Sequence, residues 1–101
     1  MQYDVRILAA ADADAADIFA YIARENRDAA VRLLDRIYAA MGKLAENPER
    51  GARIKNRMLA RLGFRFLVVD PYLIFYTIVD REVHIHHITH QRRNLLSILS
   101  D

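Results

Sequence analysis

A chain of 101 residues with a net charge of +2 and no cysteine has room for one hydrophobic core, and it excludes disulfides and thiolate metal sites. No apolar run reaches the roughly 18 residues of a membrane span, and no secretory leader pattern opens the chain. We therefore expect one soluble, cytoplasmic domain that spans residues 1–101.

The N-terminal part predicts a strand followed by a helix. Apolar and polar residues alternate over most of Tyr3–Leu8, which indicates a strand. Asp12 and Asp14 are candidate N-caps for a helix that ends near Asn26. The apolar side chains of this helix fall on one face, and they are Ala15, Ile18, Phe19 and Ile22.

A second helix is expected from about Asp28 to Glu46, where Asn47-Pro48 stops it. Gly42 inside this helix either permits close packing or marks a weak position. We expect the two helices to form a hairpin. The apolar residues of the second helix recur four and three positions apart and form the seam of that hairpin, namely Ala30, Leu34, Ile37, Met41 and Leu44.

Basic residues then dominate. Residues 1–49 carry six Lys/Arg and nine Asp/Glu, whereas residues 50–101 carry nine and four. Residues 50–65, called the basic segment below, contain no acid. We expect a helical turn within this segment near Asn56–Leu62. Guanidinium groups bind carboxylate and phosphate, so the segment predicts an anionic partner, with a solvated loop as the alternative. Its basic residues are Arg50, Arg53, Lys55, Arg57, Arg61 and Arg65.

Three runs rich in β-branched and aromatic residues follow, Phe64–Val69, Tyr72–Val79 and Val83–His90. Asp70-Pro71 and Asp80–Glu82 separate them as short turns, so the runs predict an antiparallel meander. The order of elements is then β-α-α-β-β-β. It predicts an α+β fold in which a helical hairpin packs on one face of a small, mainly antiparallel sheet.

Strand alternation makes predictions about the side chains of this meander. It places Tyr72 and Tyr76 on one face, where they either stack on nucleic-acid bases or pack in the core, and core packing is favoured. It places His87 opposite the other three histidines. Three imidazoles on one face are able to hold zinc or nickel, but no carboxylate or thiol joins them, so we expect neither a metal nor a cofactor. The three are His84, His86 and His90.

Four short motifs carry a resemblance to a known family. Ala16–Ala23 contains an Asp-apolar pair followed by Tyr-Ile, Asn47–Gly51 contains Pro-x-x-Gly at a helix end, and Tyr72–Tyr76 reads Tyr-x-Ile-x-Tyr. His90–Asn94 is similar to a closing His-x-x-Arg-Asp, with Asn94 in place of the usual acid. In these motifs and their order, the chain resembles the RelE/ParE toxin superfamily of bacterial toxin–antitoxin systems, and its ParE branch most.

The resemblance implies a function. Toxins of this superfamily are wrapped by the extended or helical C-terminal part of a small antitoxin. The RelE branch cleaves mRNA on the ribosome, and the ParE branch poisons DNA gyrase. For this chain it implies a ParE-type toxin that inhibits gyrase and is neutralised by a ParD-like antitoxin. The alternatives are a ribosome-dependent mRNA interferase and an inactive member that only binds its antitoxin.

RNA cleavage requires a base, an acid and cations that stabilise the developing phosphorane charge. The partial candidates are Arg65 and Arg93 as phosphate contacts and His90 as acid or base. No Tyr or His follows His90, and Leu95–Leu99 reads as an apolar tail or short helix. We therefore expect a binding toxin rather than a nuclease. The structural alternatives are an ion pair of Arg65 with Asp70 or a helix acid, and a hydrogen bond from His90 to a carbonyl.

The expected contact residues form two groups. An antitoxin tail should pack apolar side chains against the hairpin and sheet, with acids near the basic segment. For the target we expect Arg57, Arg61, Arg65, His90, Arg92 and Arg93. For the antitoxin we expect Ile18, Tyr21, Ile22, Arg50, Arg53 and Tyr76.

Overall fold

The computed structural model describes residues 2–92, so the predicted tail Leu95–Leu99 lies outside the described part. Within that part, no helix has the length and apolar character needed to cross a bilayer. The strands are β1 (Asp4–Ile7), β2 (Ala52–Arg53), β3 (Arg65–Val69), β4 (Tyr72–Val79) and β5 (Glu82–His90). The helices are α1 (Ala9–Ala23), α2 (Arg27–Gly42) and α3 (Arg57–Arg61), with short 3-10 turns η1 (Lys43–Ala45) and η2 (Pro48–Arg50).

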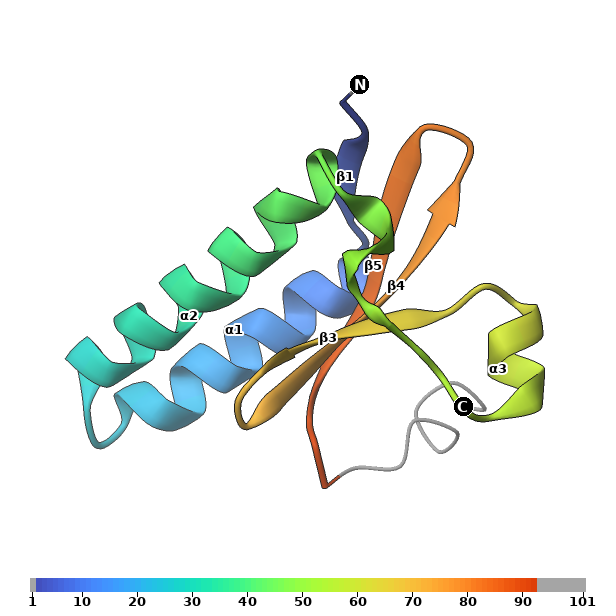
Figure 1. Ribbon diagram of the computed structural model, residues 1–101. Helices are drawn as coiled ribbons and strands as arrows, with labels where there is room; N and C mark the ends of the chain where they lie inside the picture. The colour runs from blue at the N-terminus through green and yellow to red at the C-terminus, as the bar shows by residue number, and fades with distance from the viewer. Residues whose placement is uncertain (1, 93–101) are drawn as a thin grey trace.

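The five strands form one sheet in the order β1-β5-β4-β3-β2. β1 runs parallel to β5, and every other pair of neighbours is antiparallel. Figure 1 shows α1 and α2 side by side against the sheet, with α3 set apart beside the start of β3. The predicted α+β fold is confirmed, and the parallel pair is possible because the hairpin and the meander supply the long connection that parallel strands need.

The main core lies between the hairpin and the sheet. Side chains from α2, β4 and β5 that are fully buried fill it, and they include Ile37, Met41, Ile74, Tyr76 and Ile85. A smaller cluster on the opposite face joins α3 to the sheet through Leu59, Phe64 and Phe75. Because neighbouring residues of a strand point to opposite faces, β4 contributes alternately to the two cores.

The first helix begins at Ala9, before both predicted N-caps, so that prediction is wrong. Leu8 takes the N-cap position with an extended backbone, and its N–H donates to the carbonyl of Ile85 at 3.0 Å. Alanines at the start of α1 favour helix, whereas a side-chain cap is worth only about 1 kcal/mol. The helix therefore starts as soon as the chain leaves the sheet, and Asp14 lies inside it.

The second helix agrees more closely with its prediction. Its N-cap is Asn26, whose side-chain oxygen accepts the N–H of Ala29 at 3.0 Å. The predicted seam faces the core. Leu34 of this seam is only half-buried, however, and its neighbour Leu33, which was not predicted, is buried. Gly42 ends α2, and a Cβ added there would meet nothing within 4 Å. Close packing at this glycine is therefore excluded.

A β-bulge interrupts the pairing of β4 with β5. Phe75 is opposite His87, but the next residue, Tyr76, is opposite Ile85, so His86 is the extra residue. A bulge of this kind shifts the strand by one residue and reverses the faces beyond it. The three predicted strands of the meander are confirmed, but their simple alternation ends at this point.

The bulge separates the histidines that were expected to share a face. His86 lies on the face away from the hairpin, where its Nε2 is 2.9 Å from the hydroxyl of Thr77, the residue opposite His84. His90 lies on the hairpin side, and its ring meets that of Tyr72 edge-on at 5.6 Å. The prediction of a common face for His84, His86 and His90 is therefore wrong.

Candidate functional site

The basic segment folds into the edge of the sheet formed by β2 and β3. Arg53 lies directly opposite Arg65 in this pair. Asn56 begins α3 by accepting the N–H of Leu59 at 3.0 Å, and Gly63, with φ of 84°, turns the chain from α3 into β3. The predicted helical turn is confirmed, but β2 was missed because two residues are too few to show a strand pattern.

A buried tyrosine and a half-buried arginine hold the turn before β2. The hydroxyl of Tyr76 donates to the carbonyl of Pro48 at 2.7 Å and accepts the N–H of Gly51 at 2.9 Å. Arg65 Nη1 donates to the carbonyls of Glu49 and Gly51 at 3.2 and 3.0 Å. A Cβ on Gly51 would overlap the Tyr76 hydroxyl. These contacts explain why a glycine closes the Pro-x-x-Gly motif and why a tyrosine ends the Tyr-x-Ile-x-Tyr motif.

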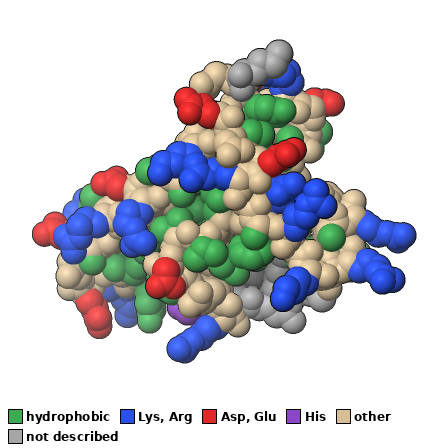
Figure 2. Space-filling model, in the orientation of Figure 1, with side chains coloured by type: hydrophobic (Ala, Val, Ile, Leu, Met, Phe, Trp, Pro, Cys, Tyr) green, Lys and Arg blue, Asp and Glu red, His purple; other side chains and the backbone are tan. Residues whose placement is uncertain are grey.

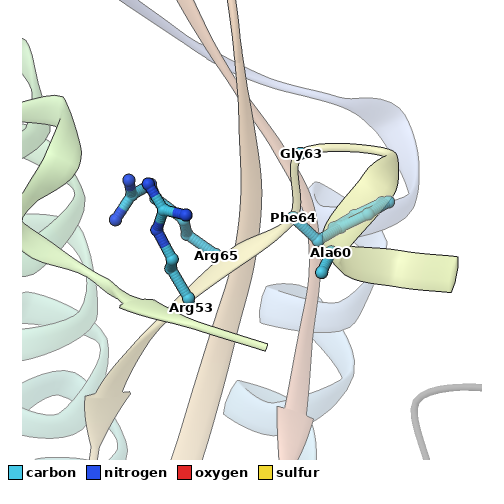
Figure 3. A pocket seen from close by; sticks show the side chains of 5 residues that line it. All are labelled: Arg53, Ala60, Gly63, Phe64 and Arg65. Carbon is cyan, nitrogen blue, oxygen red and sulfur yellow. The ribbon is translucent and has the colours of Figure 1, made fainter. Parts of the chain in front are cut away.

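A hollow of about 200 Å³ lies beside the arginine pair. Arg53 and Arg65 line one part of it, and Ala60, Gly63 and Phe64 line the other. Figure 3 shows the two guanidinium groups close together on one side of β3, with Ala60 and Phe64 on the α3 side. The hollow is therefore bordered by positive charge on one side and by apolar side chains on the other.

The basic segment forms no salt bridge within residues 2–92. The salt bridges in that range join Arg6 and His84 to Glu82, and His87 to Asp14. The alternative in which Arg65 forms an ion pair with an acid is therefore not observed, because backbone carbonyls are its partners. In Figure 2, basic side chains gather around α3, whereas acidic and basic side chains alternate over the hairpin. This end of the molecule is therefore positively charged.

A second hollow, of about 210 Å³, lies at the opposite end of β4, between α1 and the sheet. Asp17 and Tyr21 line it from α1, and Tyr72 and His90 line it from the strands. Tyr21 is 72% exposed. His90 accepts the backbone N–H of Arg92 at its Nδ1, at 3.2 Å, so neutral His90 carries its proton on Nε2. The expected hydrogen bond from His90 to a carbonyl is not the one observed.

Burial sets the ionisation of both tyrosines of β4. Desolvation raises the pKa of Tyr72, and Tyr21 raises it further. Desolvation also raises the pKa of Tyr76 above its usual value, despite the hydrogen bond from Gly51 and the charge of Arg65, which lower it. Both phenols stay protonated at neutral pH, so the Tyr76 hydroxyl is available as a donor.

Asp14 has a role that the sequence did not reveal. β1 ends opposite Ile85, so among the described residues 2–92 the rest of β5 has no strand beside it on that side. The Asp14 carboxylate accepts the N–H of Ile88 at 2.9 Å and contacts His87 Nδ1 at 3.1 Å. It thereby occupies a backbone donor of an open strand edge. Only the proximity of α1 to β5 could have indicated this contact, and no local pattern encodes it.

The candidate nuclease residues are not assembled. Arg65 is opposite Tyr76 and His90 is opposite Tyr72, and these two partners are four residues apart along β4. That is about 13 Å of strand, with a further two strand spacings, about 10 Å, across the sheet. These are backbone separations, and the side chains of Arg65 and His90 also line two different hollows. Arg93 lies outside the described residues, and within residues 2–92 no three His, Asp or Glu side chains converge as metal ligands.

The two predicted contact groups do not occupy separate surfaces. Arg53 of the antitoxin group and Arg65 of the target group share the first hollow, while Tyr21 and His90 share the second. Tyr76 is 0% exposed, so its expected contact with an antitoxin is wrong. Ile18 and Ile22 are half-buried on α1, and the exposed arginines of both groups are Arg50, Arg53, Arg57, Arg61 and Arg92.

Comparison with known proteins identifies the family of this chain. Residues 5–95 match the family described as the ParE toxin of the type II toxin-antitoxin system parDE. Toxin RelE2 of Caulobacter vibrioides is 41% identical over 81 residues, which cover 80% of this chain and 86% of that protein.

Solved structures show the same fold. The chromosomal ParDE system from P. aeruginosa superposes with a TM-score of 0.72 at 18% identity, over 88% of this chain and 96% of that one. The toxin–antitoxin complex RelBE2 from Mycobacterium tuberculosis gives a TM-score of 0.60 at 26% identity, over 89% and 99%. The family match over residues 5–95 defines the class, which is the toxin component of a type II toxin–antitoxin system. Within that class, the chain belongs to the ParE toxin family.

Proposed function

We propose that this toxin acts by binding DNA gyrase, without cutting RNA, and that a ParD-like antitoxin holds it inactive. The family match supports this target, because the ParE branch resembled here poisons gyrase. The relatives of solved structure come from a ParDE system and from a RelBE2 toxin–antitoxin complex. They support a cognate antitoxin as the first partner.

The placement of Arg65 and His90 is the observation that carries the choice of a binding toxin over a nuclease. The guanidinium of Arg65 already holds two carbonyls of the turn before β2. The imidazole of His90 lies in a different hollow, beside α1. General acid–base catalysis requires its groups within hydrogen-bond reach of the same reacting atoms. Arg65 and His90 do not meet that condition.

The decisive experiment compares two reactions of the same purified toxin. One assay follows supercoiling and double-strand breakage of plasmid DNA by gyrase. The other maps the ends of mRNA after incubation with translating ribosomes. We expect inhibited supercoiling with trapped DNA breaks, and intact mRNA. Addition of the antitoxin from the neighbouring reading frame should restore supercoiling.

A ribosome-dependent mRNA interferase is the second candidate, and one observation favours it. The relative with 41% identity bears the name Toxin RelE2. Site-specific mRNA cuts in the ribosomal A site, abolished by Arg65→Ala or His90→Ala, would establish this candidate and overturn the gyrase proposal. A chain that binds its antitoxin but affects neither reaction would instead be the inactive member.

A further inference from the structure

The arginine pair at the sheet edge has an unusual electrostatic environment. Arg53 and Arg65 are direct cross-strand neighbours, and like charges in such positions destabilise a strand pair. No acid pairs with either residue within residues 2–92. Both side chains border the same hollow of about 200 Å³. An anion in that hollow would remove the repulsion between the two guanidinium groups.

The backbone contacts of Arg65 orient its guanidinium in advance. Its Nη1 donates to the carbonyls of Glu49 and Gly51. An arginine has five N–H donors, so three donors, on Nη2 and Nε, remain for a ligand. The turn that supplies the two carbonyls is itself held by the Tyr76 hydroxyl. The half-buried guanidinium therefore does not need to be ordered when a ligand binds, which lowers the entropic cost of binding.

The neighbouring strand edge indicates what kind of anion fits. β2 is the last strand of the sheet, so its outer backbone groups face no other strand within residues 2–92. An extended peptide can pair with such an edge, and its alternate side chains then point to one face. A residue opposite Arg53 would have its Cβ about 5 Å from that of Arg53. An Asp or Glu at that position reaches the guanidinium pair, and a planar carboxylate matches the guanidinium fork.

We propose that the Arg53–Arg65 hollow is a carboxylate receptor, and that an extended acidic segment of the antitoxin pairs along β2 and places one carboxylate in it. This inference rests on the proposed antitoxin partner. It assigns to the antitoxin an arginine, Arg65, that the sequence suggested as a target contact. The antitoxin and the target would then compete for the same guanidinium group.

The test compares Arg53→Gln with Arg57→Gln in binding of the antitoxin from the neighbouring reading frame. Both substitutions remove one exposed positive charge, but Arg57 lies on α3 and does not border the hollow. Titration calorimetry at low salt should show binding weakened about tenfold or more by Arg53→Gln, and by less than about threefold by Arg57→Gln. Arg53→Lys should recover only part of the loss, because it keeps the charge but not the fork.

A double-mutant cycle then locates the carboxylate. Each antitoxin Asp or Glu is changed to its amide and combined with Arg53→Gln, and one position should couple with it by about fivefold or more. Equal effects of Arg53→Gln and Arg57→Gln, or the absence of any coupled carboxylate, would overturn the receptor. A duplex DNA that loses affinity with Arg53→Gln while the antitoxin does not would assign the hollow to phosphate and also overturn it. If the unaltered chain forms no complex with this antitoxin, the proposed antitoxin partner itself is contradicted.

Discussion

The two tyrosines of β4 share a strand face and a motif but differ in their surroundings. Tyr76 is 0% exposed, and its hydroxyl joins Pro48 to Gly51. Tyr72 is half-buried beside His90, and within residues 2–92 no side-chain hydrogen bond holds its hydroxyl. Identical side chains four residues apart thus have different functions. One fixes the turn that carries the basic edge, and the other lines an open hollow next to α1.

This difference predicts how each end of β4 should respond to substitution. At the Tyr76 end, the fold and the proposed antitoxin contact depend on the same hydrogen bonds, so a change there should affect both. At the Tyr72 end, solvent reaches the side chains, so a change should leave the fold intact. Substitutions at the two ends therefore test whether Tyr76 and Tyr72 differ in this way.

The largest expected effect follows from Gly51→Ala. The added Cβ would overlap the Tyr76 hydroxyl and lie 2.9 Å from the carbonyl oxygen of Phe66. Overpacking together with the loss of a buried hydrogen bond should lower the free energy of unfolding by about 3 kcal/mol. Thermal melts should show a fall in Tm of more than about 10 °C.

Gly42→Ala is the matched control for this change. A Cβ at Gly42 meets nothing within 4 Å, and the residue lies in the last turn of α2. Alanine there should gain up to about 1 kcal/mol from its higher helix propensity. Equal melting temperatures of the two variants would show that the turn before β2 accommodates the added methyl group and that Tyr76 does not fix the turn.

The next effect in size separates the two tyrosines directly. Tyr76→Phe leaves the buried N–H of Gly51 without its acceptor, which should cost about 2 kcal/mol. Tyr72→Phe removes a hydroxyl at the margin of a hollow and should change stability by less than about 0.5 kcal/mol. Urea unfolding of both variants measures the difference. Similar losses for the two would contradict the assignment of distinct roles.

Periodic features of the sequence were sufficient to predict most of the fold. The hairpin seam and the three-strand meander each extend over enough residues to show a period. The pairing of β2, the bulge at His86 and the contact of Asp14 with β5 were not predictable, because each depends on one or two residues and on a distant partner. The basic segment was apparent from its charge, but its pairing of Arg53 with Arg65 required the register of the edge strands.

A smaller, pH-dependent effect is expected on the face of the sheet away from the hairpin. His86 is half-buried, with its ring centroid 4.8 Å from that of Phe64. Burial lowers the pKa of His86 below its usual 6.5, and nearby His84 and His87 lower it further. The unfolded chain therefore binds this proton more readily than the folded protein. The stabilisation is complete above pH 6.5 and is lost as the pH falls from there through the lower pKa of His86 in the folded protein.

His86→Gln provides the check on this pH dependence. Glutamine does not titrate, so the variant should lose less stability than the parent between about pH 8 and about pH 5.5. This range also avoids Glu82, whose pKa is lowered by its hydrogen bonds from His84 and Arg6, and whose contribution is lost only at lower pH. Urea unfolding at several pH values gives the two curves. Parallel curves for parent and variant would exclude His86 as the titrating group.

The smallest effect on stability should come from the exposed arginines of α3. Arg57 and Arg61 make no hydrogen bond or salt bridge through their side chains within residues 2–92, so reversing each to Glu should cost within about 0.5 kcal/mol. Arg65→Ala differs, because it leaves the carbonyls of Glu49 and Gly51 without their donor.

If the target is acidic or carries nucleic acid, the variants with Arg57 or Arg61 reversed to Glu should still lose growth inhibition, since the basic surface attracts such a partner. Paired melts and growth assays separate the two effects. A reversed protein that melts like the parent and inhibits growth equally well would show that the arginines of α3 are only solvated, and that any charge contact of the basic edge is made elsewhere, with Arg53 and Arg65 as the first residues to test.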